Sequence, residues 1–228
     1  MQTFQPTKRC CVALLLATHA VLVVAQGADP AINAPYLDPP FELWQQRFET
    51  EGREVFDRRH DIIAAARARA GLRVADIGAG TGLFTRLFAE QVGEGGRVYA
   101  VDIAERFVRG NVGRAREAGY AQVTGVVNSQ TDLNLPDASI DLAFICDAYH
   151  HFEQPQALLA SLRPALARGG MLVVVDFERI PGVTAEWLLR HVRAGKAEVR
   201  REIEAAGFRF VEEVKLMKEN YFLRFARD

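Results

Sequence analysis

The feature that most constrains this chain is a glycine-rich stretch set between an apolar run and a helix-like run. Residues 76–82 read DIGAGTG, and a second apolar run, residues 98–101, ends at Asp102. Glycines let the backbone approach a ligand because no Cβ intervenes, and a carboxylate after the next strand can accept hydrogen bonds from ribose hydroxyls. The order strand, glycine turn, helix, strand, carboxylate therefore predicts the cofactor half of an α/β sheet.

The glycine spacing narrows the class of cofactor. A dinucleotide fingerprint reads G-x-G-x-x-G, whereas here Gly78, Gly80 and Gly82 alternate and Leu83 occupies the position of the third glycine. This departure disfavours a nicotinamide-dependent oxidoreductase, which remains the less favoured alternative. A plain tight turn is the other alternative, but it does not need three glycines and their cost in backbone entropy.

Four segments in order resemble the class I S-adenosylmethionine (SAM) methyltransferases. The glycine stretch resembles their first motif, and Arg168 stands where the family usually has a proline. The resemblance covers roughly residues 40–228 and implies SAM as cofactor and methyl transfer to a small molecule. The other three segments are the fourth strand with its active-site loop, the turn into the fifth strand, and a final strand: residues 140–152 (IDLAFICDAYHHF), 166–175 (LARGGMLVVV) and 219–225 (ENYFLRF).

The same resemblance implies a set of cofactor contacts after the first strands. We expect the turn to face the amino-acid end of SAM, the next residues to hold ribose and adenine, and Ser129 or Gln130 to meet the adenine amine. For Asp76 a turn or capping role is the alternative, for Asp102 an N-cap, and for Cys146 simple packing. The full set is Asp76, Gly78, Ala79, Gly80, Thr81, Gly82, Asp102, Ile103, Ser129, Gln130 and Cys146.

The loop after the fourth strand is expected to face the methyl acceptor. It carries Asp147, Tyr149, His150 and His151, and His191 follows in a region that often forms a lid in the family. A histidine here can act as a general base near neutral pH, and the tyrosine can orient or shield the acceptor. The alternative is that the two adjacent histidines cap or pack on the following helix.

No metal site is expected from this loop. His150 and His151 are adjacent, and neighbouring side chains in regular structure rarely point at one ion. No other cluster of ligand residues is visible in the sequence.

Further along, three donors fall within six positions: His191, Arg193 and Lys196. They suit an anionic acceptor or a thiol, with a solvated helix face as the alternative. A thiol or metalloid is therefore the first candidate acceptor, while a quinone-like phenol or an amine stays open. We also expect Glu178 and Arg179 near the pocket mouth and a lid built from Trp44, Arg47, Phe48 and Arg53.

The chain alternates strand and helix, which argues for a mostly parallel sheet. We predict a Rossmann-like α/β fold with seven strands, a C-terminal antiparallel hairpin and helices on both faces. The domain divisions are a signal peptide or anchor at 1–25, a linker at 26–40, a lid helix at 41–70 and the methyltransferase domain at 71–228. Predicted strands span 72–77, 97–102, 122–127, 140–146, 171–177, 208–214 and 220–226; predicted helices span 82–92, 104–118, 154–167 and 185–206, the last broken near Gly195.

Composition and the N-terminus bear on partners and location. A net charge of −1 without a basic stripe disfavours a nucleic-acid substrate. Lys8 and Arg9 precede an apolar run that ends in Val23-Val24-Ala25, a secretory pattern. We expect a periplasmic or secreted protein, with membrane contact only if this segment is uncleaved; a cytoplasmic location and a SAM-binding protein without turnover are alternatives. The sequence does not predict the oligomeric state.

Overall fold

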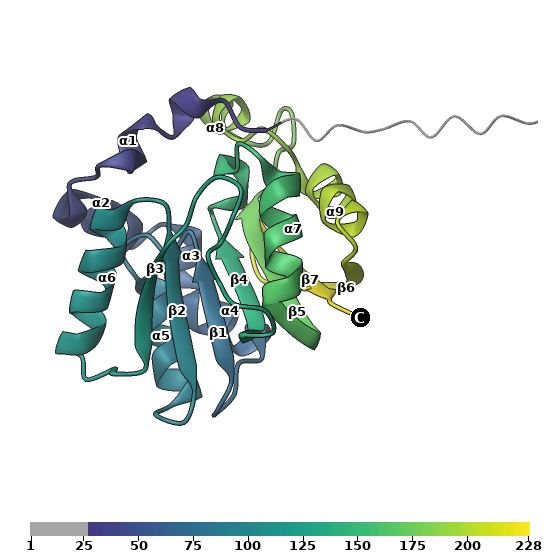
Figure 1. The fold of residues 1–228 in the computed structure, drawn as a ribbon. Helices are drawn as coiled ribbons and strands as arrows, with labels where there is room; N and C mark the ends of the chain where they lie inside the picture. Colours follow the sequence, from purple (N-terminus) through teal and green to yellow (C-terminus); the bar gives the residue numbers. More distant parts are fainter. Residues whose placement is uncertain (1–26) are drawn as a thin grey trace, which may run out of the picture.

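The computed structural model describes residues 27–228, which build one seven-stranded sheet (Figure 1). Its strand order is β3-β2-β1-β4-β5-β7-β6. All neighbouring strands are parallel except β7, which runs antiparallel to both β5 and β6. This arrangement confirms the predicted Rossmann-like sheet with its C-terminal hairpin. The strands are β1 (Arg73–Ile77), β2 (Arg97–Asp102), β3 (Val123–Val127), β4 (Ile140–Cys146), β5 (Leu166–Phe177), β6 (Arg209–Glu213) and β7 (Asn220–Ala226).

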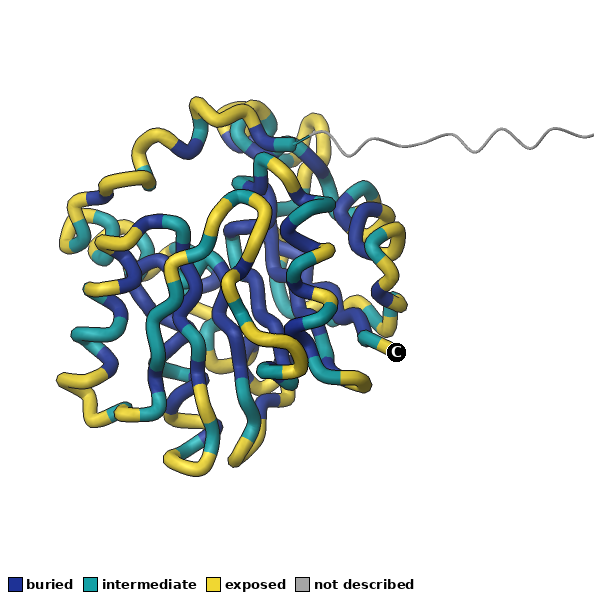
Figure 2. The backbone as a smooth tube through the Cα atoms, viewed as in Figure 1, coloured by how far each residue is buried: buried dark blue, intermediate teal, exposed yellow. Residues whose placement is uncertain are grey.

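Both faces of the sheet are buried, as a parallel sheet requires. In β1, Ala75 and Ile77 join the apolar cluster on one face, while Val74 joins the cluster on the other. Alternate residues of a strand point to opposite faces, so a short apolar strand supplies two cores at once. The buried positions follow the central strands in Figure 2.

Helices cover the two faces of the sheet and connect successive strands. The helices are α5 (Leu83–Val92), α6 (Glu105–Glu117), α7 (Pro155–Ala165), α8 (Glu186–His191) and α9 (Lys196–Ala205). The stretch predicted as one broken helix at 185–206 is two helices, with an extended N-cap at Gly195 before α9. The helix predicted to reach residue 167 ends at Ala165, because Leu166 already pairs with Ile140 in the sheet.

The N-terminal part differs most from expectation. The stretch predicted as an extended linker, 26–40, contains two helical turns, η1 (Pro30–Ile32) and α1 (Ala34–Leu37). Asp29 accepts a hydrogen bond from the Ala31 N–H at 2.9 Å, and Pro30 fits the first turn of a helix. The predicted lid helix at 41–70 is divided into α2 (Phe41–Phe48), α3 (Glu54–Asp57) and α4 (Arg59–Ala66).

In Figure 1, α1 and α8 lie above the strands of the sheet, and α2 lies beside the upper part of α6. The predicted signal segment, 1–25, lies outside the described residues. Among residues 27–228, none of the helices has the length and apolar character needed to cross a bilayer.

Candidate functional site

The site begins where the chain leaves β1. Strands β2 and β3 lie on one side of β1 and strands β4 and β5 on the other, so the order in which successive strands are added to the sheet reverses between β1 and β4. Ligands of open α/β sheets bind at such a point. Gly78 and Gly80 have φ of +71° and +51°, values that favour glycine. The Gly78 and Ala79 N–H groups donate to the Val101 carbonyl at 2.8 and 3.0 Å, which fixes the turn against β2.

Asp102 holds the turn from the end of β2. Its two carboxylate oxygens accept hydrogen bonds from the N–H groups of Gly80 and Ala104, each at 2.9 Å. Burial outweighs these bonds and raises the pKa of Asp102 to about 6. The carboxylate therefore holds the turn and the chain just before α6, and it lines the cavity. The N-cap of α6 is Ala104 and not Asp102, while the ribose contact of Asp102 stays a prediction.

A cavity of about 300 Å³ opens beside this turn, within the range of small-molecule sites. Its cofactor end has the glycine turn, a carboxylate and polar side chains after β3. Six residues predicted to contact the cofactor line it: Gly78, Gly80, Asp102, Ile103, Ser129 and Gln130. A nucleoside with an amino-acid tail is compatible with these groups, because glycine main chain, the Asp102 carboxylate and the side-chain amides of Asn128 and Gln130 all line the cavity.

The other predicted cofactor residues stand behind the cavity wall. Asp76 accepts a hydrogen bond from the Thr85 hydroxyl at 2.6 Å, and burial raises the pKa of Asp76 to about 7. Thr81 donates to Glu49. Asp76, Ala79, Thr81, Gly82 and Cys146 are not among the residues that line the cavity, so for these five direct contact with the cofactor stays a prediction.

The lid is tied down at the cofactor turn. Glu49, just after α2, accepts hydrogen bonds from Thr81, Arg86 and Arg114. Burial would raise the pKa of Glu49, but these partners lower it overall. Of the predicted lid residues, Arg47, Phe48 and Arg53 line the cavity. Trp44 packs behind them, with its ring centroid 5.1 Å from that of Phe48.

The acceptor loop starts with a strained residue. Asp147 has φ of +48°, in the region that non-glycine residues rarely adopt. Its carboxylate accepts hydrogen bonds from Arg53 and from the Asn220 amide, both at 2.6 Å. Both oxygens are therefore engaged, and although Asp147 lines the cavity, it anchors the loop to the lid and to β7.

Tyr149 does not shield the acceptor as predicted. The side chain is fully buried and its hydroxyl donates to Glu202 at 2.9 Å, on α9. Burial, with Glu202 nearby, raises the pKa of Tyr149 well above its usual range. Tyr149 is a core residue that fixes α9 to the loop, because its hydroxyl is used on the side away from the cavity.

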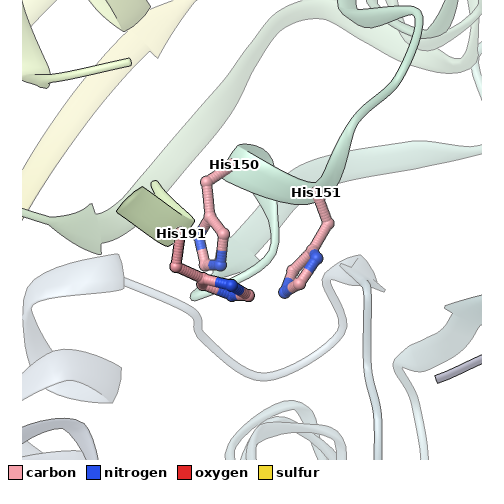
Figure 3. A group of neighbouring side chains, drawn as sticks. All are labelled: His150, His151 and His191. Atoms are coloured by element: carbon pink, nitrogen blue, oxygen red, sulfur yellow. The ribbon is translucent and has the colours of Figure 1, made fainter. Parts of the chain in front are cut away.

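Three histidines meet at the acceptor end of the cavity (Figure 3). His150 and His151 lie in a single 3₁₀ turn, η2 (Tyr149–His151), and their ring centroids are 4.2 Å apart. His191, at the end of α8, lies 5.1 Å from each of them, centroid to centroid. The expectation that the two adjacent histidines point apart was wrong, because it assumed regular secondary structure. The short 3₁₀ turn instead brings both rings to one side.

Different partners orient the two adjacent rings. The His150 ring donates from Nδ1 to Asp176 at 2.7 Å, and its main-chain N–H donates to the same carboxylate at 3.0 Å. Burial disfavours the His150 imidazolium, but Asp176 and Asp147 outweigh it and raise the pKa. Burial and the neighbouring histidines lower the pKa of His151 to about 2, and burial also lowers that of His191.

The predicted cationic patch is not formed toward the cavity. Arg193 donates two hydrogen bonds to Glu202, both at 2.8 Å, and Lys196 pairs with Glu178 and Glu213 at 2.6 and 2.9 Å. Of the three donors predicted for an anionic acceptor, only His191 lines the cavity. The argument for a thiol or other anion therefore loses its main support.

Residues that sequence reasoning missed complete the acceptor end. Asn33 and Tyr36, from the segment predicted as a linker, line the cavity, as do Phe177 and Trp187. Nothing in their local pattern marks them. The only signal that pointed to Asp176 was its place at the end of β5, next to the strand end that carries the histidines.

Comparison with known proteins agrees with this geometry. Residues 75–174 match the family model described as a methyltransferase domain. The ubiquinone/menaquinone biosynthesis C-methyltransferase UbiE of Cupriavidus metallidurans is 34% identical over 119 residues, covering 52% of this chain and 48% of that protein. The UbiE protein of Shewanella frigidimarina is 32% identical over 123 residues, covering 54% and 49%. The chain thus spans about half the length of the curated relatives it matches.

Solved structures show the same fold. A SAM-dependent methyltransferase from Aquifex aeolicus superimposes with a TM-score of 0.69 at 24% identity, covering 86% of this chain and 97% of that one. One from Mesorhizobium loti gives 0.60 at 21% identity, covering 78% and 99%. The fold and the cofactor half of the site define a nucleoside-binding α/β protein. The match to the methyltransferase-domain model covers residues 75–174, under half of the chain. In this part the chain is similar to the class I SAM-dependent methyltransferases, and the similarity indicates SAM as the cofactor.

Proposed function

We propose that this protein transfers the methyl group of SAM to a small hydroxylated aromatic acceptor. The observation that carries the proposal is a single cavity whose one end has Gly80 and Asp102 and whose other end has three histidines. Bound SAM supplies a methyl group already activated on a sulfonium sulfur. The protein therefore needs chiefly to position the acceptor and to exclude water.

The acceptor end favours a neutral ring. Phe152, Phe177 and Trp187 line this part of the cavity, and aromatic side chains contribute large apolar contact area. Arg193 and Lys196 are paired with carboxylates. Of the two arginines that line the cavity from the lid, Arg53 is paired with Asp147 and Arg47 lies over the Trp44 ring. The relatives named for ubiquinone and menaquinone biosynthesis support the same class of acceptor.

His150 is the side chain best placed to take a proton from an acceptor hydroxyl. Its Nδ1 is held by Asp176 at 2.7 Å, which leaves Nε2 as the remaining ring nitrogen. A carboxylate in this position fixes the tautomer and stabilises the imidazolium that forms. The raised pKa of His150 fits such a base, whereas His151, with its pKa near 2, stays neutral.

Cofactor binding and turnover are tested separately. Calorimetry with SAM should show binding by the wild type and a loss of about 10- to 100-fold in affinity for Asp102→Ala, the loss expected for hydrogen bonds to a charged group. Asp137→Ala is the matched control, since Asp137 is an exposed loop carboxylate. Absence of heat with the wild type removes the proposal.

Turnover is measured by mass spectrometry as release of S-adenosylhomocysteine. The acceptor panel contains phenols and hydroxyquinones, thiols, amines and metalloids. Methylation of the phenolic set supports the proposal. Methylation confined to thiols or metalloids refutes the acceptor class, and cofactor binding without product from any acceptor supports a SAM-binding protein without turnover.

We also propose that residues 1–25 direct export, on the sequence pattern alone. We also keep, as a separate proposal, the division at residue 71 between the N-terminal lid segment and the methyltransferase domain. Intact-mass measurement of protein from its native host tests cleavage after Ala25; a full-length mass would refute it.

A further inference from the structure

We propose that His150, His151 and His191 form a binding site for a divalent transition-metal cation of the zinc type, next to the methyl-transfer cavity. One ring nitrogen from each residue can be chosen so that all three lie within 4.8 Å of one another. Imidazole nitrogen is a preferred ligand of such cations. The site rests on the histidines themselves and not on methyl transfer. A bound cation would occupy His150 Nε2, so in the metal-bound protein the cation, and not His150 as a base, would activate an acceptor hydroxyl.

Hydrogen bonds select which nitrogens are available. The Nδ1 atom of His150 donates to Asp176. The Nδ1 atom of His151 lies 2.8 Å from Asn33 Oδ1, and the amide nitrogen of Asn33 donates to the His151 carbonyl and to Glu153. The Asn33 oxygen is therefore an acceptor, and His151 donates to it from Nδ1. In both rings Nε2 is left with its lone pair.

This arrangement is the one that metal-binding histidines use. A histidine ligand commonly donates its second ring N–H to a carboxylate or carbonyl, which fixes both tautomer and orientation. His150 has a carboxylate partner that also holds its main-chain N–H, and His151 has an amide oxygen. Two of the three rings are thus oriented in advance by residues of other elements.

The distances suit closure around an ion. Zinc–nitrogen bonds of about 2.0–2.1 Å in a tetrahedron place the nitrogens roughly 3.3 Å apart. With one ring nitrogen taken from each histidine, the separations are at most 4.8 Å, so closure around the ion calls for an inward movement of up to about 1.5 Å. His191 can supply it, because it is only half-buried and lies at the end of the six-residue helix α8.

The three ligands leave a coordination position toward the cavity. All three rings line the same cavity as Phe177 and Trp187. Three protein ligands with one open position is the pattern of catalytic rather than structural zinc. A cation here can hold a heteroatom of the acceptor and lower its pKa.

The test is direct metal binding by the full chain, purified without a histidine tag and stripped with a chelator. Co²⁺ is titrated while the visible spectrum is recorded, because low-coordinate Co²⁺ absorbs far more strongly than the hexa-aqua ion. We expect stoichiometric binding, an intense visible band and displacement by Zn²⁺. No band and no binding would overturn the proposal.

Variants locate the site. His191→Phe keeps an aromatic ring and removes the ligand atoms, so Co²⁺ affinity should fall by at least about 100-fold; Asp176→Asn should cost about 10- to 100-fold. His60→Phe is the control, since His60 is exposed on α4. Unchanged Co²⁺ binding in His191→Phe overturns the site. If His191→Phe does not fold, His151→Phe is used in its place.

SAM binding and methyl transfer to the acceptor panel are measured on the same preparations, so the two proposals can fail separately. Metal binding without methyl transfer supports the site and refutes the proposed function. Methyl transfer by a protein that binds no Co²⁺ or Zn²⁺ does the reverse.

Discussion

Replacing Gly78 with alanine should destabilise the protein through two separable effects. The first is the backbone: φ of +71° at Gly78 costs an L-residue with a Cβ about 1–2 kcal/mol. The second is steric, because an added Cβ would lie 2.4 Å from the Ala148 Cβ. Overpacking of a tight site costs about 1–3 kcal/mol.

Together these effects predict a loss of about 2–5 kcal/mol in the free energy of unfolding. That is a large part of the stability of a typical domain, about 5–15 kcal/mol. The clash also pushes the cofactor turn away from the acceptor loop, so the affinity for SAM should fall in the same variant. Urea unfolding and calorimetry with SAM measure the two consequences.

A second substitution separates the two effects. In the double variant Gly78→Ala/Ala148→Gly the opposing Cβ is gone, so the steric part, about 1–3 kcal/mol, should be recovered while the backbone part remains. Gly113→Ala is the matched control: it lies within α6, with nothing inside 4 Å of an added Cβ. It should gain about 0.5–1 kcal/mol.

The cycle can refute the reasoning in two ways. A loss below about 0.5 kcal/mol for Gly78→Ala would mean that the turn relaxes freely, since surface changes fall in that range. A double variant no more stable than expected from the single variants added together would show that Ala148 does not oppose the new Cβ.

Other perturbations test the support of the site. The Asp76 carboxyl, with a pKa raised to about 7 by burial, should hold its proton in the folded state below that pH; stability is then lost as pH rises from about 4, the unfolded pKa, to about 7, by on the order of 4 kcal/mol in total, and levels off above. Urea midpoints from pH 5 to 8.5 should fall for the wild type and fall less for Asp76→Asn; parallel curves would contradict this. Asp176→Asn should lower the His150 pKa, because it removes the charge that raises it, and ¹⁵N-detected histidine titration measures the shift; an unmoved titration contradicts the pairing. Glu49→Gln should weaken lid closure by about 1 kcal/mol, as partly exposed ion pairs do, seen as faster SAM release with little change in the far-UV spectrum; unchanged release would disconnect the lid from the cofactor.

Much of the fold was predictable because its signals are local. The alternation of apolar strands and amphipathic helices placed β1 to β7 within a few residues, apart from the earlier start of β5. The glycine turn was predictable for the same reason. A positive φ favours glycine, and the three positions of the turn that have a positive φ are Gly78, Gly80 and Gly82.

The acceptor end was less predictable because its contacts join distant segments. Asn33 meets His151 across 118 positions, and no local pattern encodes that pairing. From the sequence, Arg193 and Lys196 were predicted to be available as donors. In the structure they pair with Glu202 and with Glu178 and Glu213, respectively. Charged side chains are predictable as polar, but their partners are set by tertiary packing.

The N-terminal segment connects the two halves of the site. Glu49 binds the cofactor turn through Thr81 and α6 through Arg114, while Arg53, four residues on, binds Asp147 in the acceptor loop. Asn33 orients His151. A lid that opens must therefore break contacts at both ends of the cavity, so cofactor closure and orientation of the acceptor-side histidines are expected to be coupled. The segment predicted as linker and lid thus shares a cavity with the three histidines, since Asn33, Tyr36 and His151 all line it.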